Sequence, residues 1–205
     1  MPVQTITLAF TGASGMPYGI RLLECLIRAG VRVYLLHSLA AQVVAKQEMD
    51  LALPARKQEL EGWFIERFKA RPGQVSSFGR EEWFAPVASG SNPADAMVIC
   101  PCSMGTVAAI AAGLADNLIE RAADVMLKEG RKLILVPRET PFSALHLENM
   151  LRLARMNVVI LPPNPGFYHH PKNIEGLIDF VVARILDQLG ISHDLVPRWG
   201  GAVPE

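Results

Sequence analysis

Short apolar runs alternate along the chain with longer segments that repeat their apolar residues at the spacing of a helix. Apolar runs without polar alternation are typical of strands in a sheet that is covered on both faces. Strands separated by helices indicate right-handed βαβ crossovers, so we predict a single α/β domain with a doubly wound parallel sheet. The expected strands span residues 6–10, 32–36, 96–100, 132–136 and 158–161, and the expected helices span residues 16–29, 39–47, 104–115, 118–129, 143–155 and 174–189.

Two stretches depart from this alternation. Residues 50–94 contain an amphipathic piece at 57–69, a short apolar run at 75–78 and small polar residues at 88–93, and we interpret them as an excursion that ends in a binding loop. Residues 190–205 form a tail whose Trp199 we expect to pack over a site or a neighbouring subunit; a disordered tail is the alternative.

The expected helix at 104–115 carries almost no polar side chain before Asp116. A helix that is apolar all round is buried all round. One domain of 205 residues has limited room for such a helix, so we predict that it lies in a subunit interface. A central helix inside the monomer is the alternative.

Composition and charge narrow the function classes. The 20 Lys and Arg residues balance the 20 Asp and Glu residues. The chain therefore has no excess of positive charge that would favour binding to nucleic acid. We find no targeting signal and no apolar run of about 18 residues that would span a bilayer. Cys25, Cys100 and Cys102 lack metal-site spacing. We therefore expect free thiols, no metal and a cytoplasmic location.

A strand-to-helix turn is expected at Thr11 to Gly15. Gly12 and Gly15 permit positive φ and close approach of the backbone to a ligand, and the amides that open the next helix have no partner within it. The turn also carries Ala13 and the Ser14 hydroxyl. It is neither a Walker A loop nor a GxGxxG fingerprint, so it predicts a site for the phosphate of a mononucleotide. A tight turn that binds nothing is the alternative.

Two further turns are expected at the same edge of the sheet, where doubly wound folds bind ligands. Ser103 and Thr106 open the helix after the strand at 96–100, and their hydroxyls could hold a phosphate; alternatively, Ser103 is a plain helix cap. Arg138 and Glu139 follow the next strand, where the arginine could bind a phosphate and the glutamate could move a proton. A surface salt bridge is the alternative for this pair.

The last third of the chain adds candidates. The loop at 162–171 follows the final strand, and its Tyr168 can donate a hydrogen bond to a ligand. His169 and His170 are adjacent and point opposite ways on an extended chain, so they predict no metal site. Arg184 stands in an apolar helix and needs an anionic partner, which is either a phosphate or Asp187.

These residues occur in motifs that strongly resemble the flavin prenyltransferases, the UbiX-like family. The resemblance runs from residue 5 to about residue 199 and implies a Rossmann-like fold. The matching motifs are Thr-Gly-Ala-Ser-Gly at 11–15, Cys-Pro-Cys-Ser at 100–103, Asp-Asn-Leu-Ile-Glu-Arg-Ala at 116–122, Val-Pro-Arg-Glu at 136–139, His-Leu-Glu-Asn-Met at 146–150 and Pro-Gly-Phe-Tyr at 165–168.

The resemblance implies a function. Members of the family join the dimethylallyl group of dimethylallyl phosphate to N5 and C6 of reduced FMN without a metal, and UbiD-like decarboxylases receive the prenylated FMN. The prenyl-phosphate site is implied to be built from more than one subunit of a homo-oligomer. The expected pathway is either quinone synthesis, as in ubiquinone biosynthesis, or aromatic-acid breakdown.

The resemblance also implies roles for individual residues. The catalytic residues are expected to be Ser14, Glu48, Lys128 and Glu139. FMN is expected to contact Gly12, Ala13, Ser14, Ser38, Ser103, Met104, Gly105, Thr106 and Arg138. The substrate pocket is expected to include Trp83, Arg121, Lys128, Arg138, Glu139, Tyr168, Arg184 and Trp199. The sequence departs from the family pattern at His37 and Leu39, where an aliphatic residue and often a lysine flank the serine, and this leaves the contacts of Ser38 open.

Two other function classes stay open at this point. An FMN-dependent cysteine decarboxylase would carry a Pro-Ala-Ser-Ala-Asn turn, whereas residues 101–105 read Pro-Cys-Ser-Met-Gly. A non-catalytic flavin carrier would not require a second phosphate site. The sequence leaves open the subunit count, the recipient decarboxylase, and the choice between monophosphate and diphosphate donors.

Overall fold

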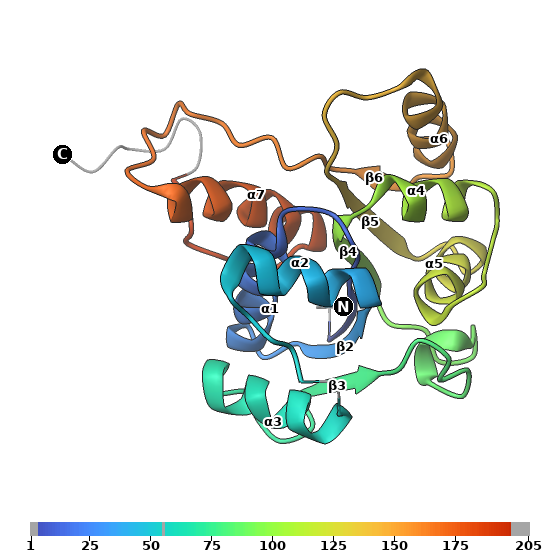
Figure 1. The fold of residues 1–205 in the computed structure, drawn as a ribbon, viewed down its shortest axis with the longest axis horizontal. Coiled ribbons are helices and arrows are strands. Elements are labelled where there is room, and N and C mark those ends of the chain that lie inside the picture. Colours follow the sequence, from blue (N-terminus) through green and yellow to red (C-terminus); the bar gives the residue numbers. More distant parts are fainter. Residues whose placement is uncertain (1–3, 55, 198–205) are drawn as a thin grey trace.

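The structure is a computed structural model and describes residues 4–54 and 56–197. Within these residues, six parallel strands form one sheet in the order β3-β2-β1-β4-β5-β6, which confirms the predicted doubly wound sheet (Figure 1). The strands are β1 (Thr5–Phe10), β2 (Arg32–His37), β3 (Val75–Phe78), β4 (Ala96–Cys102), β5 (Lys132–Pro137) and β6 (Val159–Ile160). The helices are α1 (Met16–Arg28), α2 (Leu39–Met49), α3 (Lys57–Phe68), α4 (Met104–Ala111), α5 (Leu118–Lys128), α6 (Ala144–Ala154) and α7 (Ile174–Leu189), with a 3-10 turn, η1 (Pro86–Ala88).

Each face of the sheet is covered by its own group of helices. One apolar core joins the sheet to α1, α2, α3 and α7, and a second core joins the opposite face to α4, α5 and α6. Figure 1 shows α1 and α7 on one side of the sheet and α4, α5 and α6 on the other. The alternation of strand residues explains the division, because Leu8 and Phe10 of β1 enter the first core while Ala9 enters the second.

Two details differ from the sequence-based expectations. The run at 75–78 is not an isolated piece, since β3 pairs in parallel with β2 and extends the sheet at its edge. The helix expected at 104–115 ends at Ala111, because Gly113 follows it with a φ of 73° and the chain turns away. Residues 198–205, including Trp199, lie outside the described part of the chain.

No helix within residues 4–54 and 56–197 is both long and apolar enough to cross a membrane.

An ion pair joins α1 to α7 across the first core. Arg21 donates from Nε to Oδ1 of Asp179 at 2.7 Å and from Nη2 to Oδ2 at 3.2 Å. The two side chains are only 25% and 21% exposed, and the hydrogen bond to Asp179 is the main cause that raises the pKa of Arg21. A two-point contact of this kind fixes the orientation of both partners, so it aligns the two helices.

We predict that Asp179→Ala lowers the free energy of unfolding by about 1–2 kcal/mol, because Arg21 then loses its main partner in a half-buried position. Urea unfolding followed by circular dichroism measures the effect. The control is Glu59→Ala, which breaks the pair between the 85% exposed Arg56 and the 56% exposed Glu59 and should change stability by less than about 0.5 kcal/mol. Equal effects of the two substitutions would contradict the prediction.

Candidate functional site

The turns that follow β1 and β4 are bonded to each other through one buried hydroxyl. Thr11 is 2% exposed, and its Oγ1 donates to the carbonyl oxygen of Pro101 at 3.0 Å and accepts from the N–H of Ser103 at 2.8 Å. The strand order reverses between β1 and β4, which is where doubly wound sheets bind ligands. The predicted meeting of the two turns is thereby confirmed.

The glycines of the first turn serve different purposes. Gly15 has a φ of 111° and precedes α1, so it needs the conformational freedom that the sequence predicted. Gly12 is required by close approach instead, because a Cβ there would lie 2.4 Å from the Cβ of Ala40 on α2. Ala13 is buried, whereas Ser14 is exposed and available to a ligand.

Glu48 occupies part of the position that the sequence assigned to a phosphate. The N–H of Gly15 donates to both carboxylate oxygens of Glu48, at 3.0 and 3.1 Å, and the N–H of Met16 donates to Oε2 at 2.8 Å. A carboxylate is favoured at a helix N-terminus by the unpaired amides and the helix dipole. The contact therefore brings Glu48 from the end of α2 to the turn that carries Ser14.

The second turn is organised by its own hydroxyls. Ser103 caps α4, since its Oγ accepts from the N–H of Thr106 at 3.2 Å and lies 3.0 Å from the Thr106 Oγ1. The capping role given above as an alternative is thus correct for Ser103, and it leaves the exposed Gly105 and the half-buried Thr106 on the outer side of the turn. Met104 is buried beneath them.

A cavity of about 180 Å³ opens beside these turns. It brings together two expected flavin contacts, Ser38 and Thr106, with residues to which the sequence analysis assigned no ligand contact. Among the latter, Asn117 caps α5 through its side chain, so its amide is fixed at the cavity wall. The lining comprises Thr11, Leu36, His37, Ser38, Phe78, Gly79, Arg80, Thr106, Asn117, Leu118, Ile119 and Glu120.

The structure shows where the two residues that depart from the family pattern, His37 and Leu39, lie relative to Ser38. Ser38 caps α2 by accepting from the N–H of Ala41 at 3.1 Å. Burial lowers the pKa of His37, so its imidazole is neutral beside the cavity. Leu39 is 69% exposed and does not line the cavity. Of the two unusual neighbours, only His37 therefore borders the space next to Ser38.

Arg138 and Glu139 extend from the end of β5 toward the second turn. The N–H of Arg138 donates to the carbonyl oxygen of Cys102 at 3.2 Å. Glu139 is half-buried and accepts from the N–H of Thr140 at 3.2 Å. The two side chains form no ion pair with each other, and within the described residues the Arg138 guanidinium has no hydrogen-bond partner. The arrangement leaves its charge available to an anion.

The other residues expected around the substrate phosphate do not converge within one chain. Arg121 and Lys128 belong to α5, whereas Arg184 belongs to α7, and these helices pack on opposite faces of the sheet. Figure 1 shows α5 and α7 on opposite sides of the strands. Within one chain, the sheet therefore separates Arg121 and Lys128 from Arg184.

Local contacts hold Arg121, Lys128 and Tyr168 in place. Arg121 donates from Nε to the carbonyl oxygen of Ala88 at 3.0 Å, and Lys128 pairs with Glu129 at 2.5 Å. The ring of Tyr168 packs edge-on against Phe180 with centroids 5.6 Å apart. Trp83 is 45% exposed in the loop before η1.

The three cysteines are free thiols, as predicted. Cys100 and Cys102 are fully buried in β4, and burial raises their pKa values, with a smaller electrostatic contribution of Cys100 at Cys102. Burial raises the pKa of Cys25 to about 11. All three are protonated near neutral pH, so none is suited to act as a nucleophile or a metal ligand.

Comparison with known proteins identifies the family. A family model described as "Flavoprotein" matches residues 1–186. The chain is 57% identical over 197 residues to the flavin prenyltransferase UbiX of Pseudomonas aeruginosa, which covers 96% of this chain and 94% of that protein. It is 45% identical over 199 residues to the flavin prenyltransferase UbiX of Methanothermobacter thermautotrophicus, which covers 97% of each protein.

Solved structures agree with the sequence comparison. AnUbiX (PadA1) in complex with FMN and dimethylallyl pyrophosphate superposes with a TM-score of 0.86 at 40% identity, covering 98% of this chain and 100% of that one. A dodecameric FMN-dependent UbiX-like decarboxylase from Escherichia coli O157:H7 superposes with a TM-score of 0.84 at 41% identity, covering 97% and 100%. The chain therefore belongs to the Flavoprotein family and, within it, to the UbiX-like flavin prenyltransferases.

Proposed function

We propose that this protein joins the dimethylallyl group of dimethylallyl phosphate to N5 and C6 of reduced FMN and releases phosphate. The observation that carries the proposal is the pair of turns bonded through Thr11 beside a cavity. Arg138 follows the adjacent strand β5, and its backbone N–H donates to Cys102 at the second turn. The high identity to named flavin prenyltransferases supports the same reaction. The prenylated FMN would pass to a UbiD-like decarboxylase, in the cytoplasm.

The residues around the cavity fit a flavin nucleotide. Ser38, Thr106 and Asn117 present hydroxyl and amide groups for the phosphate and the polar chain of FMN, and Phe78 presents an aromatic ring. The exposed Gly12 and Ser14 lie at the neighbouring turn. When bound, reduced FMN would supply the nucleophilic positions that accept the prenyl group, while the protein binds and orients both reactants.

The charges that develop during the reaction explain why the phosphate of the prenyl donor needs cations around it. Cleavage of the allylic carbon–oxygen bond places positive charge on carbon and negative charge on phosphate, and fixed cations stabilise the latter. Lys128, Arg138 and Arg184 would bind the phosphate, with Arg121 and Tyr168 nearby. Aromatic faces, such as Trp83 and the tail residue Trp199, would stabilise the allylic cation.

Carboxylates near the two turns would accept the proton that leaves C6 when the new ring closes. Glu139 and Ser14 are the proposed relay, and Glu48 would support Ser14 from the N-terminus of α1, where two backbone amides fix its carboxylate. Lys128 would assist departure of the phosphate. These roles rest on the family motifs and on the positions of the turns.

The separation of α5 from α7 supports a site completed by a second copy of the chain. Lys128 and Arg121 of one subunit would face Arg184 and Tyr168 of another. The half-buried Ala108 and Ala109 of α4 and the exposed Leu145, Leu147 and Leu151 of α6 offer apolar surface for such an assembly.

We predict that anaerobic incubation with reduced FMN and dimethylallyl phosphate yields a flavin whose mass is higher by one five-carbon unit. Glu139→Gln should slow this gain by about 10²–10⁴-fold, because the proton acceptor is lost while its shape is kept. Mass spectrometry of the released flavin measures the product, and Glu66→Gln on the exposed side of α3 is the matched control. Unchanged flavin with folded, FMN-loaded protein would refute the prenyltransferase proposal and leave a carrier or a cysteine decarboxylase.

We further predict that two inactive variants complement each other. Lys128→Ala and Arg184→Ala should each lose most activity alone, whereas co-expressed mixed oligomers should regain activity at about a quarter of their sites, since random pairing then places an intact α5 beside an intact α7. The control mixture of Lys128→Ala with the Lys128→Ala/Arg184→Ala double variant should regain none. Activity of the first mixture at the level of its separate components would contradict a shared site.

A further inference from the structure

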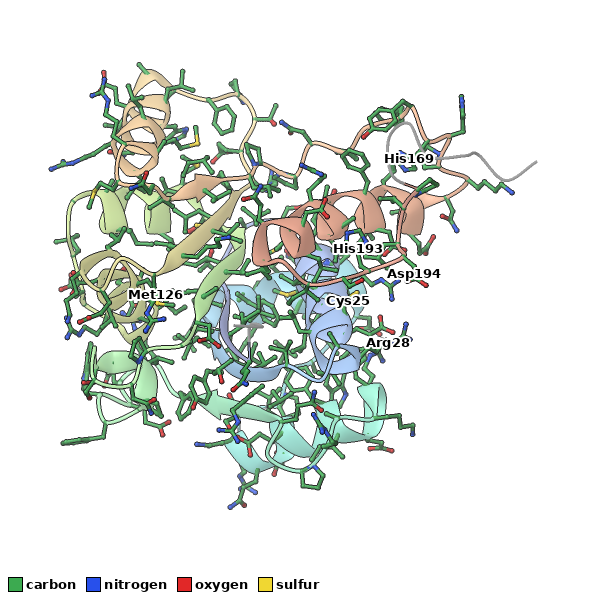
Figure 2. The ribbon with its side chains drawn as sticks, turned by 180° about the vertical axis from the view of Figure 1, so that it is seen from behind. Cys25, Arg28, Met126, His169, His193 and Asp194 are labelled. Atoms are coloured by element: carbon green, nitrogen blue, oxygen red, sulfur yellow. The ribbon has the colours of Figure 1, made fainter. Side chains whose placement is uncertain are left out.

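The carboxylate of Asp187 is bound on both sides at the end of α7. Its Oδ2 accepts from Nη1 of Arg184 at 2.6 Å, and its Oδ1 lies 3.2 Å from Nε2 of His193. Arg184 is 54% exposed, Asp187 is 38% exposed and His193 is only 12% exposed. Figure 2 shows His193 on the segment that follows α7, close to that helix. The three side chains form a chain of contacts from the interior to the surface.

The fold places His193 beside Asp187 because the chain reverses directly after α7. Gly190 ends the helix with a φ of 70°, and the N–H of Ile191 donates back to the carbonyl oxygen of Leu186 at 3.0 Å. Ile191 and Leu195 then pack against the first core. These contacts anchor the segment on both sides of His193 in sequence.

The surroundings of the His193 imidazole determine which of its two ring nitrogens carries the proton. Nδ1 of His193 is buried and has no partner in the part of the chain that the structure describes. A neutral imidazole has one donor and one acceptor nitrogen, and a buried donor without a partner is costly. The proton therefore belongs on Nε2, which donates to Asp187.

We propose that Asp187 is a positioning residue for Arg184 and that His193 holds Asp187 in place. The inference rests on the proposed function, in which Arg184 binds the phosphate of the prenyl donor. Asp187 engages Nη1, so the other donors of the planar guanidinium stay available to a phosphate. A long side chain that is already oriented loses less conformational freedom when the substrate binds.

A second arginine–carboxylate ion pair in the same chain serves as a comparison for the pair of Arg184 and Asp187. Arg56 and Glu59 have the same spacing of three residues, but their atoms are 3.2 Å apart and the side chains are 85% and 56% exposed. No hydrogen bond fixes Glu59 from its other side among the described residues. Isolated exposed pairs of this kind contribute little, whereas Asp187 is held by a nearly buried histidine.

The test measures binding of dimethylallyl phosphate to the complex with oxidised FMN by calorimetry, so that no turnover is needed. Asp187→Ala should weaken binding by about three- to fivefold, the most that a partly exposed ion pair supplies, with the affinity for FMN unchanged. In the Arg184→Ala background, the same substitution should have no further effect, because Asp187 acts through Arg184.

Conservative variants separate positioning from general structure. Asp187→Asn keeps one oxygen acceptor for Arg184 but places an amide N–H₂ opposite the Nε2–H of His193, so it should recover only part of the affinity. His193→Ala should weaken binding by about twofold as the less direct partner, and His193→Gln, which keeps a donor, should restore it. Glu59→Ala is the matched control and should leave binding unchanged.

Two outcomes would overturn the inference: unchanged binding by Asp187→Ala, or additive losses of affinity for Arg184→Ala and Asp187→Ala. A wild-type complex that binds no dimethylallyl phosphate would instead refute the proposed function, so the two failures are distinguishable.

Discussion

The ligand-binding edge of this protein depends on the buried hydroxyl of Thr11. It accepts one backbone hydrogen bond and donates another across the point where the sheet reverses its strand order. A valine would nearly match its shape but would leave the amide of Ser103 without its partner, and a buried unpaired donor is costly. The carbonyl of Pro101 would keep only the hydrogen bond from the backbone N–H of residue 11. The position of Ser103, and through its cap the start of α4, therefore follows from a side chain in the turn after the neighbouring strand β1.

The two-faced packing of the sheet has a direct consequence for function. Parallel strands require crossover helices on both faces, so residues on α5 and α7 are separated by the sheet itself. Under the proposed function, a reaction that needs cations from both helices would take place where two chains meet.

Periodicity predicted the fold well because the central strands are buried on both faces and read as continuous apolar runs. It did not assign β3 to the sheet, since this short edge strand alternates between buried Val75 and Ser77 and half-buried Ser76 and Phe78. The site was predicted less completely. The turns were found from their glycines and hydroxyls, but the contact of Glu48 with Gly15 joins residues 33 positions apart, and no local pattern encodes it. The same holds for Asn117, whose place at the cavity wall depends on how α5 packs.

Two carboxylates, Glu48 and Asp187, fix the positive groups of the proposed site. Glu48 binds the amides at the start of α1, and Asp187 binds Arg184. Each contact orders a donor but also reduces the positive potential that a phosphate would experience, because opposite charges at close range offset each other. The affinity for a second anion must then come from the sum of several cations, among them Lys128 and Arg138. Lys128 on α5 lies across the sheet from Arg184 on α7. Under the proposed function, the affinity for the substrate would therefore belong to the assembled oligomer, and the contacts within each chain would orient its cations beforehand.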